Sequence, residues 1–230
     1  MTTPIWLKDI ECKCCGAKFK TPRLKPSALV VKNMDSDFHK TYDSVNPMFY
    51  AITTCSECNY SARNEDFEKV LLEYHPEIMK LAQGIKTSGK IVKFSQTTEV
   101  TLDDAVNKHL LAIAFYKCFK PENQNTISGL YMHLTWMYRE VEDVEKEKVY
   151  LAKSLEYYIK TYEKGSFVPE KLGEPGIIYM IGELNRRLGD NNEAVKWFAR
   201  AVQHQQISNF SNIENLARDG WEKITQEKRK

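Results

Sequence analysis

The chain has 230 residues, of which 42% are apolar and 28% are charged, and its formal net charge is +2. This is the composition of a soluble globular protein, and the near-neutral charge excludes the strongly basic surface of a general nucleic-acid binder. The longest apolar run, Leu110–Tyr116, is too short to cross a bilayer, which needs about 20 residues. No basic region followed by an apolar one opens the sequence, so we expect a cytoplasmic protein without a secretory signal.

Four cysteines near the amino terminus form two pairs, each with a two-residue spacer. This spacing lets both thiolates of a tight turn bind one ion at about 2.3 Å, and two such turns complete a tetrahedron. Gly16 and Asn59 follow the pairs directly, and both residue types tolerate a positive φ angle. The sequence therefore predicts one structural Zn²⁺ with four ligands: Cys12, Cys15, Cys55 and Cys58.

Other thiols and one imidazole leave alternatives to this assignment. The four cysteines could instead be free thiols or a redox pair, and the long separation of the two pairs departs from a compact zinc ribbon. Cys14 is either a bystander or a thiol activated by the neighbouring zinc and lysines, and we favour the bystander. His39 could replace one thiolate, but four cysteines already suffice, so we expect a surface histidine.

The first part of the chain predicts a small mixed head. Ala28–Val31 and Met48–Thr54 are β-branched and aromatic runs, so we expect strands there. Asp35 and Asp37 lie in the intervening turn as solvated acids, because two carboxylates are too few for a calcium site. Helical spacing then covers Asp66–Gln83.

The next residues predict the boundary between this head and a helical body. His75-Pro76 is interpreted as a helix-end signal, and Lys90–Phe94 as one more short strand. We expect a zinc-binding head over 1–75, a linker or short strand and turn region over 76–100, and a body over 101–230.

From Thr101 onwards the pattern is one of consecutive helices joined by short links. The expected helices are Thr101–Phe119, Asn125–Glu140, Asp143–Lys164, Ile177–Leu188, Asn192–Gln203 and Ile213–Lys228. The predicted fold is thus mainly α, with a small zinc-ribbon-like α+β head followed by a tetratricopeptide-like body of helical hairpins.

The repeat assignment depends on small and large residues near the carboxyl terminus. Gly182 and Ala194 let two helices approach, Phe198 fills their groove, and Ala201 admits the next helix. Gly189-Asp190 provides the turn between them. An ordinary helical hairpin that fits the spacing by chance is the alternative.

The chain as a whole resembles the bacterial domain-of-unknown-function family 2225. The matching motifs are Cys12-x-x-Cys15-Gly16, Asp35-x-Asp37, Pro47-x-x-Tyr50, Cys55-x-x-Cys58-x-Tyr60-x-Ala62, Leu111-Ala112, Leu134-x-Trp136-x-Tyr138-Arg139 and Ile181-Gly182-Glu183-Leu184-x-Arg186-Arg187-Leu188-Gly189. The chain departs from the family at Asn59, Lys13 and Ser56, and no departure removes a ligand. The resemblance implies a zinc-type head and a helical-repeat body, and it implies no activity.

These patterns favour a non-catalytic adaptor that binds a protein partner through its helices. Arg139, Arg186 and Arg187 are the candidate partner-binding residues, because arginine is enriched at binding hot spots. The simpler alternative pairs Arg187 with Glu183 at an i,i+4 spacing and gives Trp136 a core position.

Two other function classes remain as alternatives. A nucleic-acid role would use the basic residues of the head, which are Lys18, Lys20, Arg23 and Lys25. An enzyme is less favoured, because no catalytic or phosphate-binding motif occurs and four cysteines would close the metal site. The sequence favours neither membrane insertion nor any particular oligomeric state.

Overall fold

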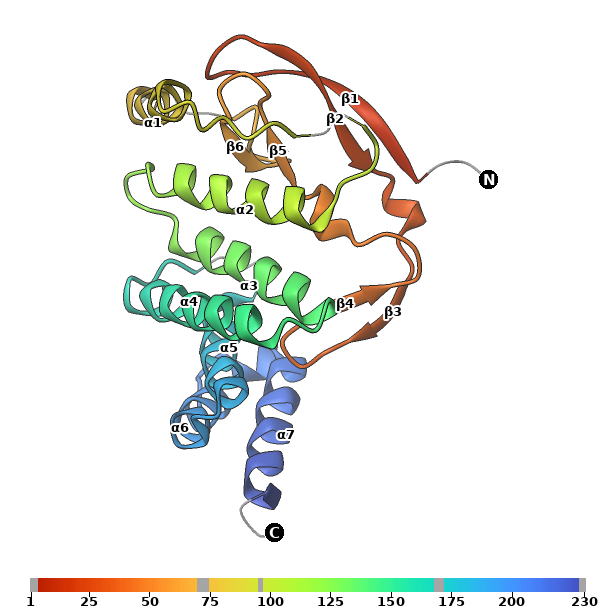
Figure 1. Cartoon of the computed structure of the whole chain (residues 1–230). Helices are drawn as coiled ribbons and strands as arrows, with labels where there is room; N and C mark the ends of the chain where they lie inside the picture. The colour runs from red at the N-terminus through yellow and green to blue at the C-terminus, as the bar shows by residue number, and fades with distance from the viewer. Residues whose placement is uncertain (1–3, 70–74, 95–96, 168–171, 228–230) are drawn as a thin grey trace. The chain divides into compact units, whose positions relative to one another are not determined.

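The computed structural model describes residues 4–69, 75–94, 97–167 and 172–227, and it confirms a mainly helical chain (Figure 1). The chain forms two compact units. Unit 1 comprises Met1–Asn33 and Lys40–Asn123, and unit 2 comprises Met34–His39 and Gln124–Lys230. The expected boundary over residues 76–100 does not coincide with this division, which falls after Asn123.

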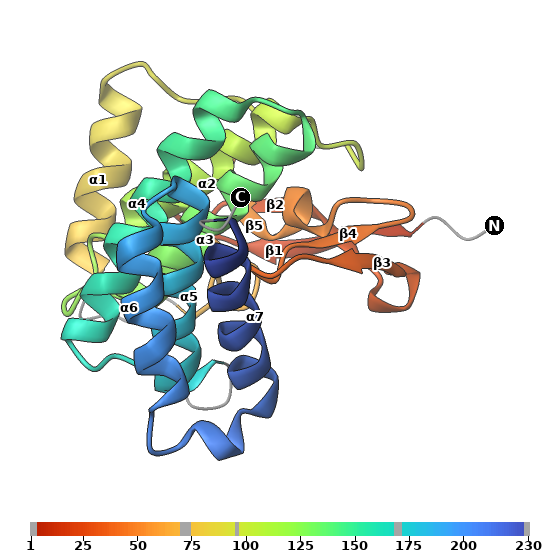
Figure 2. The ribbon, with the colours of Figure 1, turned by 90° about the horizontal axis from the view of Figure 1, so that it is seen from below.

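Three two-stranded sheets occur in the described part of the chain. The strands are β1 (Ile5–Glu11), β2 (Lys18–Leu24), β3 (Val31–Met34), β4 (Lys40–Tyr42), β5 (Ile52–Thr54) and β6 (Ser61–Arg63). β1 and β2 form the long antiparallel hairpin drawn in red in Figure 2. The turn after β3, Met34–His39, belongs to unit 2.

The first predicted strand is displaced to Val31–Met34, the second is shortened to Ile52–Thr54, and the β1–β2 hairpin was not predicted. Pro26–Ala28 and Pro47–Tyr50 form 3-10 helices, so the regular strands begin only at Val31 and Ile52. In each case a proline at the start fixes φ near the helical value. The β1–β2 hairpin was missed because its strands lack the continuous β-branched runs used to identify strands.

Unit 1 also contains two helices, α1 (His75–Thr87) and α2 (Leu102–Tyr116). The prediction of a helix end at His75-Pro76 was wrong: α1 begins there, since proline is tolerated in a first helical turn. Of the expected helix over residues 66–83, positions 70–74 lie outside the described residues. The expected strand Lys90–Phe94 is irregular chain.

Helix α2 belongs with the strands rather than with the helical body. It packs against β5 and β6, and the ring of Phe115 meets that of Tyr60 edge-on at 5.2 Å. The hydroxyl of Tyr116 accepts a hydrogen bond from the backbone N–H of Arg63 and donates one to Asp66. These contacts place α2 in the core of unit 1.

Unit 2 is built from five helices in the described residues. They are α3 (Gln124–Glu140), α4 (Val144–Glu163), α5 (Gly173–Leu188), α6 (Asn191–Val202) and α7 (Ser211–Glu227). The side chains of Asp143 and Asp190 cap α4 and α6, as Asp and Asn commonly do at helix starts. Gly189 ends α5 with φ of 89°, which makes the turn that the sequence predicted.

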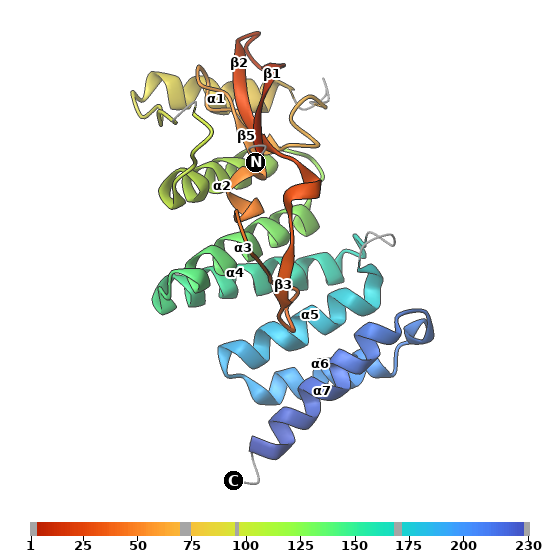
Figure 3. The same cartoon turned by 90° about the vertical axis from the view of Figure 1, so that its right-hand side faces the viewer.

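The expected close packing is present around Phe198 of α6. α5, α6 and α7 pack on one another (Figure 3), and Phe198 is completely buried among them. A Cβ atom at Gly182 of α5 or at Gly220 of α7 would lie 2.7 Å from its ring. The hairpin arrangement is therefore confirmed, and its assignment to the tetratricopeptide class stays a prediction.

We expect Gly182→Ala to lower the free energy of unfolding by about 1–3 kcal/mol, because the added methyl group must displace a buried ring. Gly129→Ala is the matched control, since this position in α3 has no atom within 4 Å of the added carbon. The control should raise stability by about 0.5–1 kcal/mol. Urea unfolding of the full chain, followed by the helical signal, measures both changes, and equal midpoints would contradict the packing described here.

None of the described helices combines the length and the apolar character that a membrane span requires.

Candidate functional site

The first cysteine pair lies in the turn that joins β1 to β2. The backbone N–H of Gly16 donates to the carbonyl of Cys12 at 2.7 Å, and Cys12 donates to the carbonyl of Ala17 at 2.8 Å. Gly16 has a φ of 73°, a conformation that glycine adopts without strain. This turn directs the sulfurs of Cys12 and Cys15 toward one point.

The second pair forms a closely similar turn between β5 and β6. Asn59 donates its N–H to the carbonyl of Cys55 at 3.0 Å and has a φ of 54°. Its buried side chain also holds the irregular segment at Val92: it accepts from the Val92 N–H at 2.9 Å and donates to the Val92 carbonyl at 3.0 Å. Asn59 therefore serves both the turn and the packing of unit 1.

The two turns bring four sulfurs together. All four lie within 4.8 Å of one another. The distance is 3.8 Å between Cys12 and Cys58 and 3.6 Å between Cys15 and Cys55. A tetrahedron with metal–sulfur bonds of about 2.3 Å has edges of about 3.8 Å. The set can therefore hold one metal ion.

The close approach of the sulfurs shifts the pKa values of three of the four thiols. Hydrogen bonds from Cys14, Cys55 and Cys58 lower the pKa of Cys12. The same contact with Cys12 raises the pKa of Cys55 to about 12, and it also raises that of Cys58. Zinc binding by such a set is coupled to the loss of the thiol protons, because the thiolate is the form that binds the metal.

Cys14 lies beside this cluster without joining it. Its sulfur is buried and lies 3.1 Å from the sulfur of Met79 on α1. The hydrogen bond to Cys12 raises the pKa of Cys14 to about 12. Cys14 lies outside the four-sulfur set, and its role as a bystander stays a prediction.

The basic residues of the head do not form one open patch. Lys18 and Lys20 lie directly across the hairpin from Glu11 and Asp9, which offset their charge. Arg23 turns inward and donates to the hydroxyl of Thr53 at 2.6 Å. Lys25 is separate from them and immediately precedes the 3-10 helix Pro26–Ala28.

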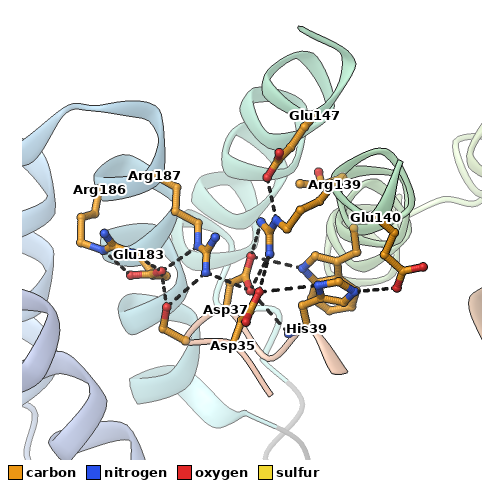
Figure 4. A network of polar contacts seen from close by, with 12 residues as sticks. Asp35, Asp37, His39, Arg139, Glu140, Glu147, Glu183, Arg186 and Arg187 are labelled. Carbon is orange, nitrogen blue, oxygen red and sulfur yellow. Dashed lines mark hydrogen bonds and ion pairs between the residues drawn. The ribbon is translucent and has the colours of Figure 1, made fainter. Parts of the chain in front are cut away.

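A second polar cluster lies within unit 2 and is shown in Figure 4. Its centre is Asp37, whose side chain is 0% exposed. Arg139 of α3 donates to its Oδ2 at 2.8 Å, and the indole N–H of Trp136 donates to the same oxygen at 3.2 Å. Arg187 of α5 lies 3.4 Å from Oδ1. A single buried carboxylate therefore links two helices.

Glu183 of α5 is the second buried acid of this cluster. It accepts hydrogen bonds at 2.8 Å from Arg186 and from Arg187, and one at 2.6 Å from the hydroxyl of Ser36. The hydroxyl of Tyr179 donates to the Ser36 carbonyl at 2.7 Å. The turn Met34–His39, which we call the tip, is thus bound to α5 through both its side chains and its backbone.

The expectations for Asp35, Asp37 and His39 need correction. His39 is buried, stacks on the indole of Trp136 at 5.5 Å, and has its Nε2 3.0 Å from Glu140, so it is not a surface residue. Asp37 is buried, and Asp35 pairs with Arg139 at 3.1 Å. The sequence missed this cluster because its members are distant along the chain.

The arginines determine the charge state of the buried acids. Burial alone would raise the pKa of Asp37, but the hydrogen bonds from Arg139 and the charge of Arg187 outweigh it, and the pKa is lowered. Burial also opposes ionisation of Glu183, whose pKa is lowered by Arg186 and by the Ser36 hydroxyl. Arg139, Arg186 and Arg187 are therefore occupied within their own chain, including the i,i+4 pair of Arg187 with Glu183.

An open groove lies elsewhere on unit 2. Its volume is about 590 Å³, which is within the usual range for ligand sites. It is lined by Tyr162, Glu174, Ile178, Lys196, Ala199, Arg200, Gln203, His204, Gln205 and Gln206. The guanidinium of Arg200 lies 4.5 Å from the ring centre of Trp197 and 5.7 Å from that of Tyr162.

Comparison with known proteins gives one match. No curated protein and no solved structure matches the chain. Residues 5–224 match the family described as "Uncharacterized protein conserved in bacteria (DUF2225)". This span includes both cysteine pairs, the tip and its arginines, and the groove. The chain therefore belongs to the bacterial family DUF2225.

Proposed function

We propose that the protein is a non-catalytic adaptor of the cytoplasm. In this proposal a structural Zn²⁺ stabilises unit 1, and unit 2 holds an acidic segment of a partner protein. A cytoplasmic location suits a chain with six free cysteines, because that compartment keeps thiols reduced.

Zinc is the metal that suits the four-cysteine cluster best. Soft thiolate ligands in tetrahedral geometry select zinc or iron–sulfur centres, and a single set of four cysteines is typical of structural zinc. Four protein ligands leave no open position for a substrate or a reactive water. The donor set thus favours a structural role over metal-dependent catalysis.

Arg200 in the groove is the observation that carries the adaptor proposal. Its guanidinium lies 4.5 Å from the ring centre of Trp197 and 5.7 Å from that of Tyr162, and it forms no ion pair among the described residues. These cation–π contacts hold the guanidinium in place while its N–H groups stay available to bind a carboxylate in bidentate fashion. Arginine beside aromatic rings is the composition of binding hot spots.

The remaining lining of the groove suits an extended acidic peptide. Lys196 pairs with Glu193 at 2.5 Å and His204 lies 3.4 Å from Glu174, so both already have acidic neighbours. Gln203 and Gln206 add exposed amide groups that can bind a peptide backbone. We therefore expect a partner segment with one central Asp or Glu among polar residues.

The three arginines predicted from the sequence are less suited to this role. Arg139, Arg186 and Arg187 would contact a partner only if the tip left its buried position. That step would separate Asp37 and Glu183 from their cations, at a cost of several kcal/mol. We therefore place the partner at the groove, although stacked helical hairpins offer more than one binding surface.

Arg200→Glu should strongly weaken partner binding, because it puts a like charge opposite the partner's carboxylate. We expect an affinity loss of about 2 kcal/mol or more, which is roughly 30-fold. The matched control is Arg218→Glu on α7, an exposed arginine paired with Glu214 at 2.6 Å. Recovery of partners from cells of the native host, quantified for both variants and the parent, measures the effect.

Equal recovery by Arg200→Glu and the parent would reject the groove as the binding surface. Loss in both variants would mean that general surface charge, rather than Arg200, determines binding. Turnover of a small molecule that depends on the bound metal would reject the adaptor proposal itself.

A further inference from the structure

Lys108 of α2 is a buried cation in unit 1. The residue is 5% exposed and forms no ion pair among the described residues. Its ammonium lies 5.4 Å from the ring centre of Phe94. A buried ammonium is unfavourable unless an anion or several hydrogen bonds offset the loss of water. Its position therefore calls for a further partner.

The charges around Lys108 do not supply that partner. Burial lowers the pKa of Lys108, and the positive charge of Arg23 lowers it further, while Asp104 one turn earlier on α2 opposes both effects. Asp104 is itself partly exposed and forms no ion pair with Lys108. Its charge therefore offsets only part of the cost of burying the ammonium.

A small cavity adjoins the Lys108 side chain. Its volume is about 20 Å³, which is enough for one group the size of a water molecule. It is lined by Phe19, Lys20, Thr21, Pro22, Thr54, Ser56, Phe94 and Lys108. No acidic side chain is among these residues, whereas two ammonium groups and three hydroxyl groups are.

The hydroxyl of Thr21, in the lining of the cavity, already accepts a hydrogen bond and keeps its proton for another partner. Thr21 accepts a hydrogen bond from Arg23 at 3.2 Å, so its own proton is directed away from that contact. Lys20 is exposed at the rim, and its ammonium lies 3.7 Å from the carboxylate of Asp9. The cavity is therefore lined by a buried cation, three hydroxyl groups and an exposed second cation.

We propose that this cavity is a binding site for a phosphate-type oxyanion. One oxygen enters the cavity and accepts hydrogen bonds from Lys108 and Thr21, and Lys20 contacts the oxygens that remain outside. Charge-assisted hydrogen bonds of this kind are short and strong in a poorly hydrated site. The alternative is a lysine that is satisfied by Phe94 and one water molecule, with no affinity for anions.

Titration of the metal-loaded full chain with inorganic phosphate, at an ionic strength kept constant with sodium chloride, tests this site. The parent should melt at a higher temperature as phosphate replaces chloride. Lys108→Met should weaken phosphate binding by about tenfold or more, since it removes the buried charge and keeps the side-chain length. Lys86→Met, at an exposed lysine of α1 in the same unit, should bind phosphate like the parent.

Amide chemical shifts of the parent locate the bound ion independently of any variant, so the test stands even if Lys108→Met fails to fold. We expect phosphate-dependent shifts at Thr21, Ser56 and Phe94. Shifts elsewhere, an equal response to phosphate in Lys108→Met, or a parent that does not distinguish phosphate from chloride would each overturn the proposal. If a duplex or single-stranded oligonucleotide changes the chemical shifts of these amides and free phosphate does not, the site would be assigned to nucleic acid instead.

Discussion

Removal of the metal that the four cysteines are proposed to bind is expected to unfold unit 1. In the described residues, the three sheets of this unit have only two strands each, and two of the three are short, so they bury little apolar surface of their own. The free energy of binding a structural zinc ion in small domains is about 10–16 kcal/mol, and it is largely folding free energy. Hydrogen exchange of the full chain, before and after treatment with a chelator, should show loss of protection in β1, β2, β5 and β6.

Single cysteine variants distinguish the four proposed metal ligands from Cys14. Cys55→Ser should lose the metal and reproduce the unfolding caused by the chelator, whereas Cys14→Ser should keep one metal per chain. Elemental analysis of the purified variants measures both results. A parent protein that carries no stoichiometric metal, or that keeps its protection in chelator, would contradict the structural role of the four cysteines.

Asp37→Asn should produce the second large effect, in unit 2. The substitution leaves Arg139 and Arg187 facing a neutral buried amide. Removing one partner of a buried ion pair typically lowers the free energy of unfolding by about 3–5 kcal/mol. Asp35→Asn is the matched control, because Asp35 is partly exposed and shares Arg139, so its loss should cost about 1 kcal/mol or less. Urea unfolding and hydrogen exchange in α3 and α5 measure the difference.

The same acids give unit 2 a defined pH dependence. The pKa of Asp37 and that of Glu183 are lower in the folded chain than in the unfolded one, where they are near 4. The folded state then binds fewer protons, so its stability is complete above about pH 5 and is lost as the pH falls below about 4. Asp37→Asn should flatten this acid transition, and an unchanged transition would contradict the assigned charge state.

The metal site was predictable from the sequence because its information is local. Each cysteine pair forms one tight turn, and Gly16 and Asn59 show by residue type where the backbone takes a positive φ. Helix positions were predictable for the same reason: Thr101, Asp143 and Asp190 cap helices within a few residues of themselves.

The buried charged cluster was not predictable, since its contacts join residues far apart in the chain. The sequence around Asp37 indicates only an acid in a turn. In the structure, α3 and α5 place Arg139 and Arg187 beside it. The division after Asn123 also depends on contacts between residues far apart in the chain. The apolar stripe of α2 resembles that of any other helix, and only its packing against β5 and β6 assigns it to unit 1.

Site-specific photocrosslinking tests the adaptor proposal most directly. A photoreactive amino acid at Gln203, in the groove, is compared with one at Gln226, which is exposed on α7 and lies outside it. The account predicts that Gln203 alone yields a crosslinked partner, that its crosslinked peptide contains Asp or Glu, and that Arg200→Glu abolishes the product. Identical crosslinks from both positions, or a product unaffected by Arg200→Glu, would contradict it.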